Sequence, residues 1–104
     1  MPVTVVLSTL KPGVDAKDYE SWVLDTDYAF TRSHSNFVSY VVHRVSAIEG
    51  SDAGWRYVER IEVKDADQHR KDLASPLGKQ LIDELYAKFL DRSKNIYIRS
   101  DIVE

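Results

Sequence analysis

The sequence predicts a single α+β domain over residues 1–104, with strands and helices in the order β-α-β-β-α-β. Apolar residues alternate at a spacing of two in four segments, and recur at spacings of three and four in the segments between them. Polar turn residues separate these segments. The length suits one domain, and 43% hydrophobic with 30% charged residues is typical of a globular chain.

The N-terminal part of the chain is expected to form a strand and then a helix. Residues 3–10 are largely β-branched, and the segment 11–13 contains the proline and glycine that end them. Over 15–32 the apolar residues share one helical face, and Asp15 is a suitable N-cap. A polar loop over 33–36 follows.

The middle of the chain predicts an antiparallel hairpin. Residues 37–45 and 55–63 alternate with period two, and the polar segment 49–54 between them has turn chemistry. The odd-numbered residues of the second strand are the more apolar, so we expect them to face the helices. The residues expected on the helix side of the sheet are Val5, Leu7, Phe37, Val41, His43, Tyr57, Glu59 and Ile61.

Two further helical segments and a last strand complete the pattern. Asp65 and Gln68 have the spacing of a capping box, and the short helix that they open stops at Ser75. Ser75 can cap a second helix with Pro76 at its first position, where the missing N–H has no cost. Residues 95–103 alternate as the final strand.

This βαββαβ order is the ferredoxin-like arrangement, a four-stranded antiparallel sheet with the helices on one face. On the other face we expect Val38, Tyr40 and Val42, together with a similar apolar share from the first strand. So many apolar groups are expected to be covered. Two sheets packed face to face in a homodimer would cover them, so the predicted assembly is a dimeric α+β barrel.

Composition excludes several classes of protein. A net charge of −3 and a pI near 5.6 argue against nucleic-acid binding. The absence of cysteine excludes disulfides, zinc ribbons and thiol nucleophiles, and the three histidines lack metal-binding spacing, so no metal is expected. The N-terminal segment lacks the pattern of a signal peptide or a membrane span, so we expect a cytoplasmic protein without membrane contact.

Three residues are candidates for catalysis. Glu59 is a carboxylate on an apolar strand face, where it must be hydrogen-bonded, paired or raised in pKa. His43 is expected on the same face, and such a pair can transfer protons near neutral pH. His34 lies in the 33–36 loop, where a pocket could open. A purely structural role stays open for each. Glu59 and His43 could satisfy each other in the core, and His34 could be an exposed loop residue.

Aromatic side chains could bind a planar ligand in the gap between helices and sheet, although each could equally belong to the core. Arg44 and Arg99 could pair with an anionic substituent, or be solvated charges at a strand edge. The residues expected to bind the substrate are Trp22, Phe37, Trp55, Tyr57, His69 and Tyr86.

The second half of the chain resembles dimeric α+β barrel proteins of the antibiotic-biosynthesis monooxygenase group. In that group an aromatic-rich strand carries a Glu, the next helix carries a His, and a small residue precedes the last helix. Glu59, His69 and the Ser75-Pro76 pair occupy matching places in this sequence. Those relatives oxidise polycyclic phenols without metal or flavin, and others in the superfamily bind haem or only a ligand, so the resemblance implies the fold much more specifically than an activity.

From the MPVTVVLSTLKPGVD start to the IYIRSDIV strand, the chain is similar to the RedY-like family. That resemblance implies prodiginine (tripyrrole pigment) biosynthesis, with an aromatic or pyrrolic intermediate as the ligand. One expectation is a proton-transfer enzyme without a resident cofactor, with His43 or His34 as acid or base and Glu59 orienting it. Another is a non-catalytic carrier that delivers the intermediate to a partner biosynthetic enzyme. A monooxygenase-like reaction and haem binding through His69 or His34 stay open.

Overall fold

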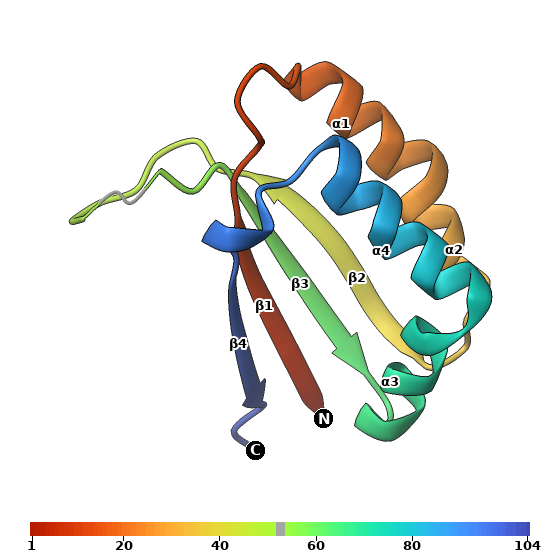
Figure 1. The fold of residues 1–104 in the computed structure, drawn as a ribbon. Helices are drawn as coiled ribbons and strands as arrows, with labels where there is room; N and C mark the ends of the chain where they lie inside the picture. The colour runs from red at the N-terminus through yellow and green to blue at the C-terminus, as the bar shows by residue number, and fades with distance from the viewer. Residues whose placement is uncertain (52–53) are drawn as a thin grey trace.

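Four antiparallel strands form one sheet, and helices cover one of its faces (Figure 1). The computed structural model describes residues 1–51 and 54–104. The strands are β1 (Pro2–Ser8), β2 (Phe37–Arg44), β3 (Tyr57–Val63) and β4 (Ile96–Asp101), in the spatial order β2-β3-β1-β4. The helical elements are α1 (Ala16–Trp22), the π-helix η1 (Val23–Asp27), α2 (Tyr28–Arg32), α3 (Ala66–Ala74), α4 (Pro76–Lys88) and the 3₁₀-helix η2 (Arg92–Lys94). The predicted ferredoxin-like α+β fold is confirmed.

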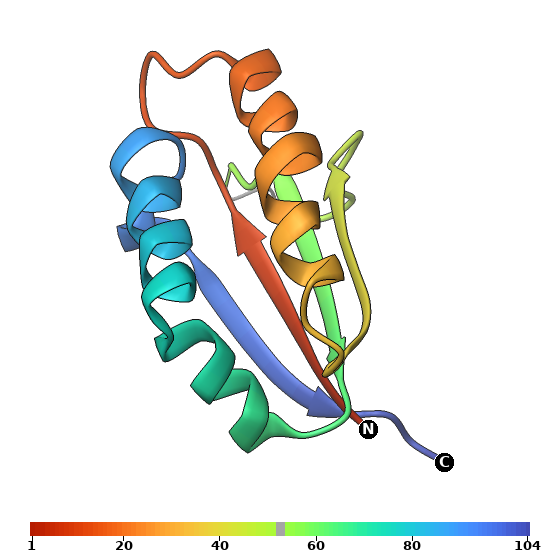
Figure 2. The same cartoon turned by 90° about the vertical axis from the view of Figure 1, so that its right-hand side faces the viewer.

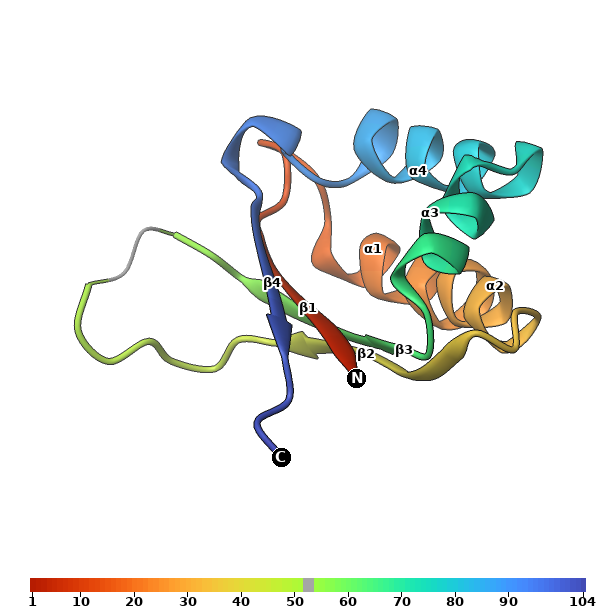
Figure 3. The same ribbon diagram turned by 90° about the horizontal axis from the view of Figure 1, so that it is seen from below.

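The molecule has two layers. Figure 2 shows α1, η1 and α2 as one continuous rod beside α3 and α4, with the sheet behind them. Figure 3 shows all of these helices on the same side of the sheet, so the opposite side is bare. In the described part of the chain, no helix is both long and apolar enough to cross a membrane.

The first helix begins as predicted but contains an unexpected turn. The Asp15 carboxylate accepts a hydrogen bond from the Lys17 N–H at 2.8 Å and caps α1. Within the predicted helix over 15–32, η1 widens to π geometry, and the Tyr28 N–H bonds to the Val23 carbonyl. Asp27 ends this turn with 3% of its surface exposed. Single π-turns occur frequently at functional sites, so this position is of interest.

The C-terminal helices have the predicted N-caps. Ser75 accepts a bond from the Gly78 N–H at 3.1 Å, and Pro76 is the first residue of α4. Asp65 caps α3 through the N–H of the second residue after it. The reciprocal capping box was wrong, because the Gln68 amide donates to Asp72 instead.

The hairpin strands are shorter than predicted. A bond of 2.9 Å from the Val45 N–H to the Arg56 carbonyl continues the ladder past the end of β2. Asp52 and Ala53, which belong to the expected turn over 49–54, lie outside the described residues.

A β-bulge between Phe37 and Ser39 changes the faces of β2. Phe37 pairs with Val63 on the helix side, but after the bulge Tyr40 and Val42 also face the helices. The predicted placement of Val41 and His43 on the helix side was therefore wrong, as was the outward placement of Tyr40 and Val42. One extra residue in a strand reverses the side-chain alternation, and this exchange is the result.

The side chains of β1 also lie on the opposite faces of the sheet from those predicted. Val5 pairs with Arg60 and Leu7 with Val58, and the even-numbered residues of β3 face away from the helices. Both were expected on the helix side. A strand with apolar residues at nearly every position carries no alternation from which to infer a face.

The outer face of the sheet is apolar, as expected, but through a different set of residues. Ile96 and Ile98 are 43% and 46% exposed on β4, at the edge of the sheet. The register places the following apolar side chains on this face: Val5, Leu7, Val41, Val58, Ile96 and Ile98.

Candidate functional site

A cavity of about 490 Å³ lies between the sheet and the helices. That volume lies within the range of small-molecule sites. Its walls are largely apolar and come from both layers, whereas its polar groups gather at two ends. Apolar lining residues include Val6, Phe30, Phe37, Ile61, Leu81 and Leu85.

At one end, the side chains of Asp27, Tyr40 and Glu59 form a buried cluster, which we call the acid cluster. The Tyr40 hydroxyl lies 2.7 Å from Oδ2 of Asp27 and forms a second hydrogen bond with Oε1 of Glu59. Asp27 and Glu59 are 3% and 7% exposed, and all three residues line the cavity. The cluster therefore joins η1, β2 and β3 at the cavity wall.

This cluster retains a proton near neutral pH. A hydroxyl has one hydrogen, so Tyr40 can donate to one carboxylate at a time, and its second contact needs a carboxyl group that donates. Burial, and then the charge of Asp27, raises the pKa of Glu59 to about 7. Burial raises the pKa of Asp27 to about 6, and the bond from Tyr40 lowers the pKa of each carboxyl in part. Burial also raises the pKa of Tyr40, which keeps it a neutral hydroxyl.

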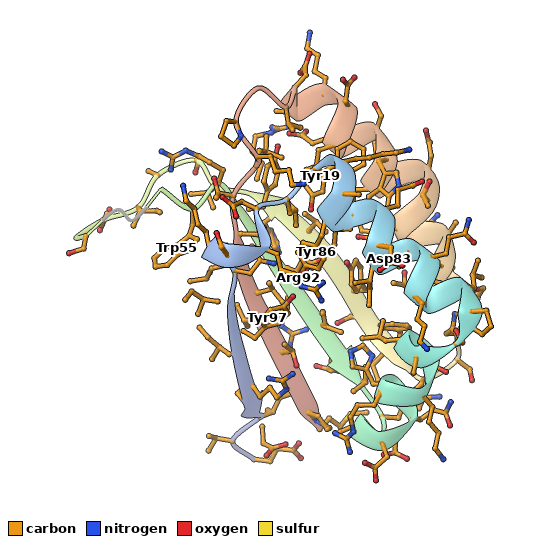
Figure 4. All side chains as sticks on the ribbon, viewed as in Figure 1. Tyr19, Trp55, Asp83, Tyr86, Arg92 and Tyr97 are labelled. Atoms are coloured by element: carbon orange, nitrogen blue, oxygen red, sulfur yellow. The ribbon has the colours of Figure 1, made fainter. Side chains whose placement is uncertain are left out.

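At the other end, two tyrosines meet between α4 and β4. The hydroxyls of Tyr86 and Tyr97 are hydrogen-bonded to each other, and the Asn95 amide donates to Tyr86 at 2.8 Å. The Arg92 guanidinium lies 4.5 Å from the centre of the Tyr86 ring (Figure 4). Burial raises the pKa of Tyr86, so this end presents the neutral Tyr86 hydroxyl and an aromatic surface.

His69 reaches the cavity from α3. Its ring packs edge-on against Phe37 with the ring centres 5.5 Å apart, and its Nδ1 is buried without a hydrogen-bond partner in the described structure. Burial lowers the pKa of His69, and the charge of Arg99 acts in the same direction. A neutral imidazole at pH 7 is therefore part of the wall.

Four of the predicted site residues line the cavity: Phe37, Glu59, His69 and Tyr86. Glu59 has the properties that its position in an apolar strand predicts, since it is both hydrogen-bonded and raised in pKa. The fold brings the four together from β2, β3, α3 and α4.

The other two catalytic candidates lie away from the cavity. His43 is exposed on the outer face opposite Val58, so the predicted pair with Glu59 does not form. The His34 Nδ1 lies 2.8 Å from the Phe30 carbonyl, so its ring caps the last turn of α2. Its position is that of a helix-capping residue beside the cavity and not of a lining residue.

Three aromatic residues expected to bind the substrate have other positions. Tyr57 is buried in the core, where its hydroxyl donates to Glu20 at 2.7 Å. Trp22 packs in the same core. Trp55 lies in the hairpin loop beside η2, and its indole N–H donates to the Lys94 carbonyl at 3.3 Å (Figure 4). None of the three lines the cavity.

Sequence reasoning missed two members of the acid cluster. Asp27 follows Val23 by four residues and precedes Phe30 by three, so helical spacing already places its carboxylate on the buried face. Tyr40 was assigned to the outer face, and no local signal marks the bulge that turns it inward.

Within residues 1–51 and 54–104, no three His, Asp or Glu side chains gather closely enough to hold a metal ion. The absence of a metal or cofactor stays a prediction from the sequence.

The sheet, its one-sided helical cover and the cavity between them define a ferredoxin-like α+β protein with a helix–sheet cavity. The chain belongs to the HapK family, since the family model for the REDY-like protein HapK matches residues 2–101. No curated protein matches the chain.

Solved structures show the same fold. HapK from Hahella chejuensis is 21% identical with a TM-score of 0.77, and the match covers 100% of this chain and 95% of that one. SnoaB, a cofactor-independent oxygenase from Streptomyces nogalater, is 20% identical with a TM-score of 0.72, covering 99% and 93%. A dimeric ferredoxin-like protein of unknown function from Thermobifida fusca is 9% identical with a TM-score of 0.73, covering 97% and 90%.

Proposed function

We propose that this protein binds a small aromatic or pyrrolic intermediate of prodiginine-type pigment biosynthesis in the helix–sheet cavity and transfers a proton on it. The observation that carries this proposal is Glu59, a buried cavity carboxyl whose pKa is raised to about 7. A general acid or base acts best when its pKa lies near the working pH. Membership of the HapK family and the resemblance to RedY-like proteins support the pathway.

The proposed chemistry moves one proton between two positions of the ligand. Glu59 has the higher pKa of the two carboxyl groups and holds the shared proton, which it gives to one atom of the ligand while the Tyr40 hydroxyl holds the cluster together. The Glu59 carboxylate then takes an acidic hydrogen from another atom of the same ligand, which restores its starting state. The transfer is balanced and needs no oxidant. In this proposal Glu59 takes the role of acid or base that the sequence suggested for His43 or His34.

The cavity walls fit a planar ligand. Phe30 and Phe37 lie edge to face with ring centres 6.4 Å apart, and Tyr86 provides a third aromatic surface. Aromatic and aliphatic side chains fill the wall between the polar groups, which suits a conjugated ring system better than a sugar or a phosphate. His69, with its lowered pKa, adds a neutral polar contact.

We also propose a homodimer that forms through the outer face of the sheet. Ile96 and Ile98 are nearly half exposed there, beside the apolar side chains of β1 and β3. An apolar sheet face of this kind is typically buried against a second sheet. The dimeric description of the Thermobifida fusca protein supports this proposal. The expected compartment is the cytoplasm, where a partner biosynthetic enzyme would supply or receive the ligand.

The test uses extracts of a pigment-producing strain from which the gene has been deleted. Purified protein is added in D₂O, and mass spectrometry follows which intermediate is consumed, deuterated or retained. We expect conversion or deuterium exchange with the native protein and a loss of about 100-fold with Glu59→Gln. The control Glu62→Gln removes a carboxylate from the outer side of β3 and should keep the native rate.

Other outcomes would contradict proton transfer. Stoichiometric retention of an unchanged intermediate would assign the carrier function. Consumption of dioxygen with an oxidised product would assign a monooxygenase-like reaction. Native rates with Glu59→Gln would remove this residue from the chemistry.

A further inference from the structure

The β4 side of the cavity contains an arginine without a counter-charge. Arg99 lines the cavity, and its register with Thr4 of β1 places its side chain on the helix-facing side. Within the described residues, no carboxylate lies at ion-pair distance from its guanidinium. Its guanidinium lies 6.0 Å from the centre of the Tyr97 ring.

The other arginines near the ligand site have partners. Arg70 forms an ion pair with Asp67 at the start of α3. Arg92 lies over the Tyr86 ring. Arg44, which the sequence also suggested as an anion-binding residue, is paired with Glu20 outside the cavity. Arg92 and Arg99 both line the cavity with a ring contact and without an ion pair among the described residues, but Arg92 lies 4.5 Å from its ring centre and Arg99 6.0 Å, so the Arg99 guanidinium is the more available to a ligand.

Other charged groups face Arg99 without neutralising it. Asp101 follows two residues later on the same side of β4 and lines the cavity, but it forms no ion pair among the described residues. His69 lies close enough for the charge of Arg99 to lower its pKa, so this neighbour is neutral at pH 7. A guanidinium stays charged under all ordinary conditions.

The distance between Arg99 and the acid cluster gives the site a direction. Val6 of β1 pairs with Glu59 on one side and Tyr97 on the other, so β1 separates Glu59 from β4. Two strand spacings correspond to about 10 Å, and Arg99 lies two residues beyond Tyr97 along β4. This span is comparable with the length of two linked aromatic rings.

We propose that the cavity selects planar aromatic or pyrrolic acids, whose carboxylate binds Arg99 while the ring at the other end reaches Glu59. This inference rests on the proposed function and names its substrate class. The planar guanidinium matches a carboxylate with two parallel hydrogen bonds. The reverse orientation would place the carboxylate beside the buried acids Asp27 and Glu59, where like charges repel. Arg99 therefore selects both the ligand and its orientation.

The test measures binding of two matched probes by isothermal titration calorimetry at pH 7.5. One is 4-(1H-pyrrol-2-yl)benzoic acid, and the other is the corresponding neutral benzamide. We expect the native protein to bind the acid about tenfold more tightly than the amide. Arg99→Gln should abolish this preference while its affinity for the amide stays native, and Arg99→Lys should keep part of it. Lys79→Gln, an equal change of charge on the exposed surface of α4, should keep the native preference.

Each result decides between the two proposals. Binding of both probes with equal affinity to the native protein would overturn the preference for acids and leave the proposed cavity function standing. A preference that survives in Arg99→Gln would likewise remove Arg99 from anion recognition. If neither probe bound, the aromatic ligand class and this inference would both be wrong.

Discussion

The hydroxyl of Tyr40 lies 2.7 Å from Oδ2 of Asp27, and this bond ties β2 to the π-turn of the first helix. Glu59 reaches the same hydroxyl from β3. The single hydrogen of the Tyr40 hydroxyl can be donated to only one of the two buried carboxyl groups. The other carboxyl group must therefore hold a proton, and it does so at a pH where exposed carboxyl groups are ionised. The acid–base character of the cavity therefore arises from shared burial of carboxyl groups and not from a histidine.

Replacing Glu59 by Gln should flatten the dependence of stability on pH. The folded pKa of about 7 exceeds the ordinary value of 4.5, so the folded state binds this proton more tightly than the unfolded state. The resulting stabilisation is complete below pH 4.5 and is lost as the pH rises to 7. Glu59→Gln should remove a decline of about 2.5 kcal/mol, measured by urea unfolding at pH 5 and 8. Glu62→Gln should decline as the native protein does, and an equal decline in Glu59→Gln would refute the linkage.

Tyr40→Phe should extend this decline to higher pH. The bond from Tyr40 lowers the pKa of both Asp27 and Glu59, so its removal should raise both values further. The pH at which the free energy of unfolding stops falling should then move above 7. Tyr28→Phe is the control, because the Tyr28 hydroxyl bonds to the Val42 backbone and not to a carboxyl group. A limit that stays at the native pH would show that Tyr40 does not support the cluster.

His43→Ala should leave conversion of the intermediate unchanged. This side chain is exposed on the outer face of the sheet, opposite Val58.

His69→Ala should weaken ligand binding several-fold, because the His69 ring packs against Phe37 in the cavity wall. Rate measurements on both variants check this contrast. A large loss in His43→Ala alone would place the chemistry outside the cavity described above.

Ile98→Lys should convert the proposed dimer into a monomer. It places a charge on the outer face, where Ile98 pairs with Val5. Light scattering should give twice the chain mass of 11.9 kDa for the native protein and a single mass for the variant. Leu24→Lys, the same kind of change at a position 63% exposed on the helical layer, should leave the dimer intact. A native monomer at micromolar concentration would contradict the proposal.

Patterns that depend on local spacing predicted the fold well. The N-caps at Asp15, Asp65 and Ser75 and the order of helices and strands along the chain follow from short-range chemistry, and the structure has all of them. The alternation of β3 also assigned its faces correctly, because polar and apolar residues differ there at every second position. That alternation is why Glu59 could be recognised as an unusual carboxylate from the sequence.

The composition of the site was harder to predict because it depends on one bulge. The irregularity after Phe37 exchanges the faces of Tyr40 and His43, and with them the residues that can meet Glu59. Asp27 carried a usable signal in its helical spacing, but its partner could not be identified without the bulge. Histidine was favoured as the base from its ordinary pKa, whereas burial raises a carboxyl into the same range.

The most direct test is an NMR titration of the Glu59 side-chain carboxyl in ¹³C-labelled protein, assigned by comparison with Glu59→Gln. A midpoint near pH 7 is the predicted result, with Tyr40→Phe titrating at a higher pH. A midpoint below pH 5 would show that Glu59 is an ordinary ionised carboxylate. It would then retain no proton at neutral pH, and the proposed proton transfer would lose its basis.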